Sequence, residues 1–210
     1  MITIKDNQLT PRLLKSCKSW LENANWSYGW PSNDKYPFGH WNVDISRTGA
    51  ANPTDIKERL PDAFKSLWDE INKKFFNDKA ILVRCYSNRH TFGTEGYIHT
   101  DTDRKEDQTI VIYMDENWNY EWGGETTFYK NGEIIKSVVP KYGRYVAFPG
   151  TVEHCAKPLS RVCPTVRTTL MFKASIDPKA VYPAEEMLDN FLREVGANKR
   201  PHKNGTLADH

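Results

Sequence analysis

The sequence contains no run of about 18 apolar residues, which excludes an ordinary membrane-spanning helix. Its first residues, MITIKDN, show no apolar stretch flanked by basic residues, so we expect no secretory signal. Cysteine is scarce: the four residues are scattered and form no CxxC pair, which argues against a zinc knuckle and a disulfide framework. We therefore expect free thiols, a reducing compartment and a cytoplasmic location.

The sequence also has no marked excess of positive or of negative charge. Lys and Arg total 29, Asp and Glu total 27, and the net charge is +2 with the signs interspersed. Because there is no basic stripe, we expect neither a nucleic acid nor a membrane as partner. What is present is ordinary for a globular protein: 39% hydrophobic, 27% charged and 12% aromatic residues. The length of 210 residues favours one structural domain with a substantial core.

The first part of the chain has helical periodicity. Thr10 and Pro11 have the residue types that begin a helix, and apolar residues follow them at helical spacing. The strongest helical pattern covers residues 61–76, with its apolar side chains on one face. Between these segments, residues 26–41 are rich in Gly, Pro and aromatic residues, which indicates a loop. Its aromatic side chains either cap the core or flank a substrate.

From residue 80 the pattern becomes that of short strands. Runs rich in β-branched and aromatic residues cover residues 80–86, 96–101, 108–114, 125–129, 133–139, 144–148 and 166–173. The KNG sequence at 130–132 predicts a hairpin, and a last helix is predicted over 183–195. We predict an α+β fold: a helical and loop region (1–79) packed on one sheet of a jelly-roll β core (80–175), then a helix and polar tail (176–210).

His99 and Asp101 form an HxD pair at the end of the predicted strand 96–101. Side chains alternate along a strand, so residues two apart present an imidazole and a carboxylate on the same face. Two histidines and one carboxylate make a facial triad, which binds Fe(II) and leaves three positions open. An isolated HxD pair is also common as a hydrogen-bonded surface pair, so a second histidine is needed.

His154, which follows the predicted strand 144–148, supplies that second histidine. Its competitor is His90, which we expect at the surface because its neighbours in 87–95 are polar. Asp103 competes with Asp101, since it has the same parity. Cys155 and Cys163, near His154, leave a zinc site as an alternative, but the triad accounts for more residues.

Arg167 and Thr169 lie on one face of the last predicted strand, by the same alternation. A guanidinium with a hydroxyl two residues away forms a clamp for a carboxylate, through charge-assisted bonds and one neutral bond. The alternative is a salt bridge at a sheet edge. Together, a metal triad and a carboxylate clamp on one β core predict a dicarboxylate cosubstrate.

Residues 84–173 resemble the catalytic core of the Fe(II)/2-oxoglutarate-dependent dioxygenases, in particular the prolyl 4-hydroxylase branch, including short bacterial and viral types. The matching segments are RCY (84–86), GYIHTDTD (96–103), IVIYM (110–114), WGGET (122–126), GRYVAFPG (143–150), EHCAKPL (153–159) and VRTTLMF (166–172). The chain is also similar to the oxygen-sensing HIF prolyl hydroxylases around CY, GY-H-D and IYM-ENW. The fold that this resemblance implies is a double-stranded β-helix.

The resemblance implies that His99, Asp101 and His154 are the iron ligands, which selects Asp101 over Asp103. It implies that Arg167 belongs to the catalytic set with them. Collagen-type prolyl hydroxylases have Lys where this chain has Arg167, a departure that leaves the substrate open.

The cosubstrate site implied by the resemblance is 2-oxoglutarate bound through its distal carboxylate by Arg167 with help from Thr169. Tyr86 and Tyr113 occupy positions where the family often has tyrosines near the cosubstrate. The cofactors implied are Fe(II), 2-oxoglutarate and O2, with ascorbate as a family expectation.

The expected reaction is hydroxylation of a C–H bond with release of succinate and CO2, on a proline of a protein or peptide. One alternative is the same chemistry on a free amino acid or other small molecule. An alternative of another class is a jelly-roll module that binds a partner without catalysis.

Overall fold

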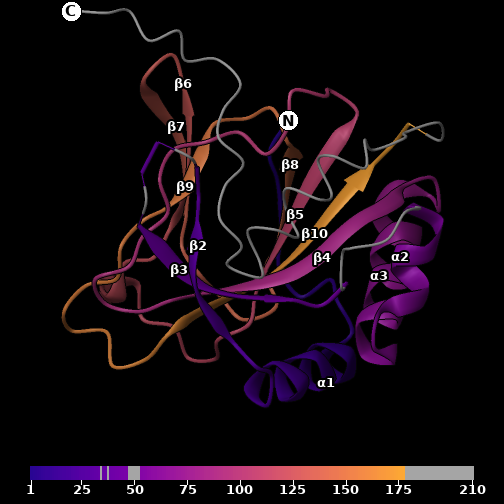
Figure 1. The fold of residues 1–210 in the computed structure, drawn as a ribbon, viewed down its shortest axis with the longest axis horizontal. Coiled ribbons are helices and arrows are strands. Elements are labelled where there is room, and N and C mark those ends of the chain that lie inside the picture. The colour runs from indigo at the N-terminus through magenta and orange to yellow at the C-terminus, as the bar shows by residue number, and fades with distance from the viewer. Residues whose placement is uncertain (34, 37, 47–52, 178–210) are drawn as a thin grey trace, which may run out of the picture.

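The computed structural model describes residues 1–33, 35–36, 38–46 and 53–177, which form helices against two antiparallel sheets (Figure 1). In chain order the elements are β1 (Thr3–Lys5), α1 (Pro11–Glu22), β2 (Ser27–Pro31), β3 (Gly39–Asp44), α2 (Pro53–Arg59), α3 (Asp62–Phe76), β4 (Ile81–His90), β5 (Asp107–Tyr113), a 3-10 turn (Tyr120–Trp122), β6 (Thr126–Lys130), β7 (Glu133–Val138), β8 (Tyr145–Pro149), β9 (His154–Ala156) and β10 (Arg167–Ser175).

The large sheet has the strand order β1-β8-β5-β10-β4-β3-β2, and the small sheet has the order β7-β6-β9. Every pair of neighbouring strands is antiparallel. Two antiparallel sheets whose neighbours are distant in sequence make the jelly-roll arrangement, so the predicted fold class is confirmed.

The helices cover one face of the large sheet, as predicted for the N-terminal region (Figure 1). Their apolar faces pack on the strands in one core, in which Phe64, Leu67 and Trp68 of α3 are almost fully buried. The opposite face of the large sheet packs on the small sheet through a second core that includes Val111, Phe128 and Phe148. The space between the two sheets is where the site residues lie.

Local signals correctly predicted several elements. Helix α1 begins at Pro11 after Thr10, and α3 begins directly after Pro61, where the proline ring fixes a backbone angle compatible with a helix start. The KNG segment forms the β6–β7 turn, in which Asn131 and Gly132 both have positive φ angles (53° and 81°). This geometry is the one that tight hairpins require.

Two expectations about strands were wrong. Residues 26–41 are not a loop throughout: β2 and β3 form a hairpin at the edge of the large sheet, because exposed aromatic residues suit an edge strand. Conversely, residues 96–101 are not a strand, since this segment has a single bridge, between His99 and His154. Strands β1 and β9 and helix α2 were not predicted, since each is short.

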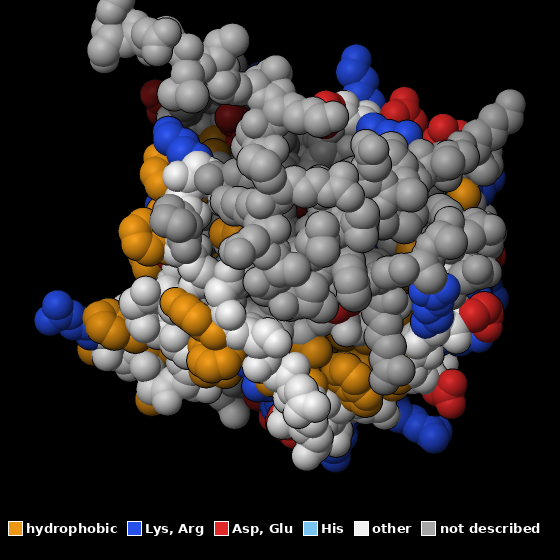
Figure 2. Space-filling model, viewed as in Figure 1, with side chains coloured by type: hydrophobic (Ala, Val, Ile, Leu, Met, Phe, Trp, Pro, Cys, Tyr) orange, Lys and Arg blue, Asp and Glu red, His pale blue; other side chains and the backbone are white. Residues whose placement is uncertain are grey.

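The remaining expectations concern the surface and the termini. Charged side chains of both signs are interspersed on the visible surface of the described residues (Figure 2). None of the described helices has the length and apolar character that a membrane-spanning segment requires. The four cysteines are free, as expected. The helix predicted over 183–195 lies outside the described residues.

Candidate metal centre and its cavity

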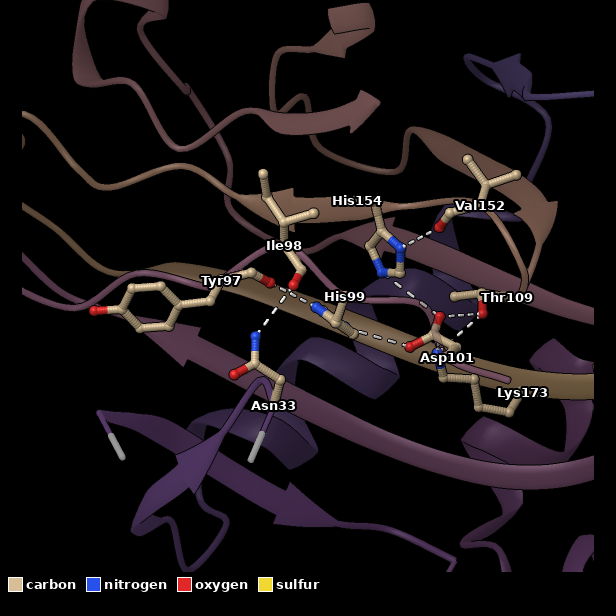
Figure 3. Close-up of polar contacts among 9 residues, drawn as sticks. All are labelled: Asn33, Tyr97, Ile98, His99, Asp101, Thr109, Val152, His154 and Lys173. Atoms are coloured by element: carbon tan, nitrogen blue, oxygen red, sulfur yellow. Dashed lines mark hydrogen bonds and ion pairs between the residues drawn. The ribbon is translucent and has the colours of Figure 1, made fainter. Parts of the chain in front are cut away.

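His99, Asp101 and His154 converge between the two sheets (Figure 3). Their ligand atoms all lie within 4.8 Å of one another. The Nε2 atom of His99 is 3.5 Å from Oδ1 of Asp101, and Nε2 of His154 is 3.5 Å from Oδ2 of the same carboxylate. Two imidazole nitrogens and one carboxylate thus face a common point.

Backbone hydrogen bonds hold the three residues in place. His99 and His154 form a two-way bridge, with N–H to carbonyl distances of 3.1 and 2.9 Å. The Asp101 N–H donates to the Gly150 carbonyl over 2.8 Å, in the turn that follows β8. Because β9 also pairs with β6, the position of His154 is fixed by the small sheet. The segment 96–101 is therefore anchored without being a strand.

The second nitrogen of each imidazole is also engaged. His99 Nδ1 lies 2.7 Å from the Tyr97 carbonyl, and His154 Nδ1 lies 2.9 Å from the Val152 carbonyl (Figure 3). A carbonyl only accepts, so Nδ1 carries the proton in both rings and Nε2 keeps its lone pair. Both lone pairs are therefore available to a metal ion.

Burial keeps His154 in the ligating form. The residue is 5% exposed, and burial lowers the pKa of His154 to about 4. Its imidazole is therefore neutral at neutral pH, as a metal ligand must be.

Asp101 lies among positive and hydrogen-bonding groups. Its carboxylate oxygen Oδ2 is paired with the ammonium of Lys173 and accepts a hydrogen bond from the Thr109 hydroxyl (Figure 3). Burial opposes ionisation, but Lys173 together with both histidines outweighs it and holds the pKa of Asp101 well below its usual range. Asp101 is thus a carboxylate, whereas its rival Asp103 is exposed and outside the cluster.

Arg167 lies at the start of β10 and is only 2% exposed. Its Nε donates to the Gly124 carbonyl over 2.6 Å, and its Nη2 donates to the Thr126 hydroxyl over 2.9 Å. Gly124 has a φ of +75°, and a Cβ there would lie 3.0 Å from the Arg167 side chain, so the GGET turn needs glycine. The alternative of a sheet-edge salt bridge is excluded, since β10 is central in its sheet.

One cavity connects the triad with most of the other predicted site residues. Arg167, Thr169 and Tyr86 line it together with the three triad residues. Tyr113 lies behind this wall: its ring is 5.3 Å from the Arg167 guanidinium, and its hydroxyl donates to Thr126 over 2.7 Å. It thus contacts residues of the cavity wall rather than the cavity itself.

The prediction that His90 lies at the surface was wrong. His90 is the last residue of β4, is 2% exposed, and lines the same cavity. The polar neighbours in 87–90 mislead because β4 continues to residue 90. The side chains of Asn88 and His90 line the cavity between the sheets, whereas Arg89 lies on the other face and donates to the Leu21 carbonyl of α1. His40 on β3 stacks on His90, with ring centroids 4.6 Å apart.

Sequence reasoning also missed Lys173 and Thr109, which contact Asp101. Lys173 has the same strand parity as Arg167 and Thr169, so continuing the alternation by four residues would have found it. His40 had no such signal, since it lay in a segment interpreted as a loop.

The donor set fits a ferrous ion. Two imidazoles and one carboxylate are the ligands of the facial triad, and the adjoining cavity leaves room for further ligands. Neither Cys155 nor Cys163 belongs to this group, so the cluster is not the cysteine-containing zinc site considered above.

Comparison with known families identifies the β core. The profile of the 2OG-Fe(II) oxygenase superfamily matches residues 82–172, from β4 to β10, a segment that contains every predicted site residue. The β core is therefore similar in sequence to the 2OG-Fe(II) oxygenase superfamily. The prediction of a 2-oxoglutarate-dependent dioxygenase is thereby confirmed. Fe(II), 2-oxoglutarate and O2 are the cofactor and cosubstrates of this superfamily.

Solved structures share the fold at low sequence identity. A 2OG-Fe(II) oxygenase family oxidoreductase from Burkholderia pseudomallei superposes with a TM-score of 0.64 at 15% identity, over 83% of this chain and 85% of that one. A prolyl-4-hydroxylase from Pseudomonas putida gives a TM-score of 0.58 at 19% identity, over 83% and 91%.

A prolyl hydroxylase from Trichoplax adhaerens, in complex with a hypoxia inducible factor peptide fragment, gives a TM-score of 0.55 at 16% identity, over 84% of each chain. No curated protein matches the sequence.

Proposed function

We propose that this 2OG-Fe(II) oxygenase hydroxylates a proline in a peptide or protein, with His99, Asp101 and His154 as the ligands of the iron. The observation that carries the assignment of the ligands is the convergence of their three donor atoms within 4.8 Å. The Nδ1 hydrogen bonds to backbone carbonyls support it, because they orient both Nε2 lone pairs toward the same point.

Arg167 is the proposed anchor for the distal carboxylate of 2-oxoglutarate, with Thr169 beside it. Both are 2% exposed and line the cavity that contains the triad. A buried guanidinium that is already held by two hydrogen bonds loses little freedom when it binds a carboxylate. Tyr86 shares this cavity and helps to exclude water, while Tyr113 supports the anchor from behind.

When bound, Fe(II) and 2-oxoglutarate supply the oxidation: O2 is reduced, 2-oxoglutarate loses CO2 to give succinate, and one oxygen atom enters the substrate C–H bond. The protein residues orient the components. The triad fixes the metal, Arg167 fixes the far end of the cosubstrate, and the buried cavity keeps bulk water from the reacting atoms.

Exposed apolar side chains near the metal-binding segment support a peptide substrate. Phe38 is 61% exposed and Ile98 is 48% exposed, next to the iron ligand His99. The ring of Tyr97 lies 4.7 Å from Tyr36 and 6.0 Å from Phe38, so these two residues between β2 and β3 lie next to the metal-binding segment. Apolar and aromatic surfaces suit a proline ring and the backbone around it. The peptide bound to the Trichoplax adhaerens enzyme is a precedent in the same fold.

Reaction with a peptide library tests this proposal. The protein with Fe(II), 2-oxoglutarate and O2 is expected to add one oxygen atom to proline-containing peptides and to release equimolar succinate, both measured by mass spectrometry. Free proline and other free amino acids form the second arm. Succinate that depends only on a free amino acid would refute the peptide substrate while leaving the oxygenase in place.

A further inference from the structure

Two histidines line the cavity without belonging to the triad. The rings of His40 and His90 are stacked at an interplanar angle of 24°. The residues are 3% and 2% exposed. Neither ring nitrogen of His90 has a hydrogen-bond partner among the described residues, and the His40 imidazole interacts with the side chain of Asn88. Buried polar atoms are nearly always paired, because an unmade hydrogen bond destabilises the folded state. Unpaired nitrogens beside a cavity therefore point to a ligand.

The register of the large sheet places this pair beside the carboxylate anchor. His90 on β4 is the direct strand partner of Arg167 on β10, so the two side chains project on the same face at neighbouring positions. His40 on the next strand, β3, completes a row through its ring stack with His90. In the adjacent row, Asn88 is the partner of Thr169. The wall of the cavity around Arg167 is thus polar over three strands.

Hydrogen-bond donors remain available in this row. Burial lowers the pKa of His40 to about 4 and that of His90 well below its usual range, so both rings are neutral with one N–H each. The Arg167 bonds to Gly124 and Thr126 use two of its five guanidinium hydrogens. Three neighbouring side chains of the cavity wall, those of His40, His90 and Arg167, thus carry N–H donors.

We propose that His40 and His90 form a second part of the cosubstrate site, donating hydrogen bonds to the distal carboxylate of 2-oxoglutarate beside Arg167. This inference rests on the proposed role of Arg167. The pair would make the site selective for a 2-oxo acid with a second carboxylate. A carboxylate of the substrate is less suited to this position, because both rings are nearly fully buried, whereas the apolar side chains Phe38 and Ile98 are open to solvent.

Calorimetric titration of the Mn(II)-loaded protein measures this selectivity without turnover. The two probes are 2-oxoglutarate and 2-oxobutyrate, which lacks the distal carboxylate. His90→Phe and His40→Phe keep a stacked apolar ring, and His90→Phe removes buried unpaired nitrogens, so we expect folding and thermal stability to be retained. His90→Gln restores one side-chain N–H donor and is the conservative control.

We expect His90→Phe to weaken 2-oxoglutarate binding about tenfold and to leave 2-oxobutyrate binding unchanged, with a smaller loss for His40→Phe and partial recovery in His90→Gln. In wild type, the imidazole N–H of His90 should become observable by NMR only when 2-oxoglutarate is added. Unchanged 2-oxoglutarate affinity in both Phe variants, or equal losses for both acids, would overturn the inference. Wild-type protein that binds no 2-oxoglutarate in the presence of Mn(II) would instead refute the proposed function.

Discussion

Asp115 gives a quantitative prediction for the strand that carries Arg167. Its carboxylate accepts a hydrogen bond from the backbone N–H of Thr168 at the start of β10. Burial raises the pKa of Asp115 from the usual 3.8 to about 6, although Thr168, Arg167 and Arg89 act in the opposite direction. Ionisation of Asp115 is therefore less favourable in the folded protein than in the unfolded chain, and it destabilises the fold.

The sign of the effect follows from the proton count. Between pH 4 and 6 the unfolded chain has already lost the Asp115 proton while the folded protein still holds it. The free energy of unfolding therefore falls as the pH rises through this window, and the loss persists above it. A rise in pKa from 3.8 to about 6 corresponds to about 3 kcal/mol, at about 1.4 kcal/mol for each pH unit.

Asp115→Asn removes the ionisation and keeps an oxygen that accepts the Thr168 N–H. At pH 7 we expect the variant to exceed wild type in free energy of unfolding by up to about 3 kcal/mol, with the difference vanishing near pH 3.5. Urea unfolding at a series of pH values measures this difference. Asp62→Asn, at an exposed carboxylate, is the matched control. A difference between Asp115→Asn and wild type that stays constant from pH 3.5 to 7 would refute the reasoning.

Three further predictions concern single side chains. Arg167→Lys should weaken 2-oxoglutarate binding, measured by calorimetry, by about tenfold to a hundredfold. The reason is that a lysine cannot keep the hydrogen bonds to Gly124 and Thr126 and also make a bidentate contact with a carboxylate. Unchanged affinity would exclude Arg167 as the anchor. Lys173→Met removes a cation that competes for the Asp101 carboxylate, so Mn(II) binding measured by electron paramagnetic resonance should strengthen on the order of tenfold; weaker binding would contradict this. The Arg144 hydrogen bonds hold the pKa of Asp6 well below its usual range. In urea unfolding, Asp6→Asn should therefore lower the free energy of unfolding at pH 7, and this difference from wild type should shrink as the pH falls below 4. An equal difference at pH 2 would contradict the ion-pair interpretation.

The sequence was sufficient for residues whose chemistry is rare in combination. His99, Asp101 and His154 could be singled out because an HxD pair followed by a later histidine matches one kind of metal site, although 96–101 is not the predicted strand, and Arg167 followed from the alternation along β10. The helices α1 and α3 were predictable from proline at their starts and from one apolar face.

The errors arose where tertiary packing decides the structure. The edge hairpin β2–β3 has the Gly, Pro and aromatic content of a loop, and only its pairing with β4 makes it a strand pair. His90 has polar neighbours in sequence, yet β4 continues to residue 90 and places the His90 side chain in a cavity between the two sheets. His40 stacks on His90 only because of the register between β3 and β4, and no local sequence pattern specifies that register.

The most direct test of the metal centre is anaerobic addition of Fe(II) and 2-oxoglutarate, followed by visible absorption spectroscopy. A complex of Fe(II) with a chelating 2-oxo acid gives a weak charge-transfer band, which we expect in wild type and in the control Asp103→Asn. The band should be lost in His99→Ala, because one of the three converging ligand atoms is removed. A wild-type protein without the band, or a band of equal intensity in His99→Ala, would contradict iron binding by His99, Asp101 and His154.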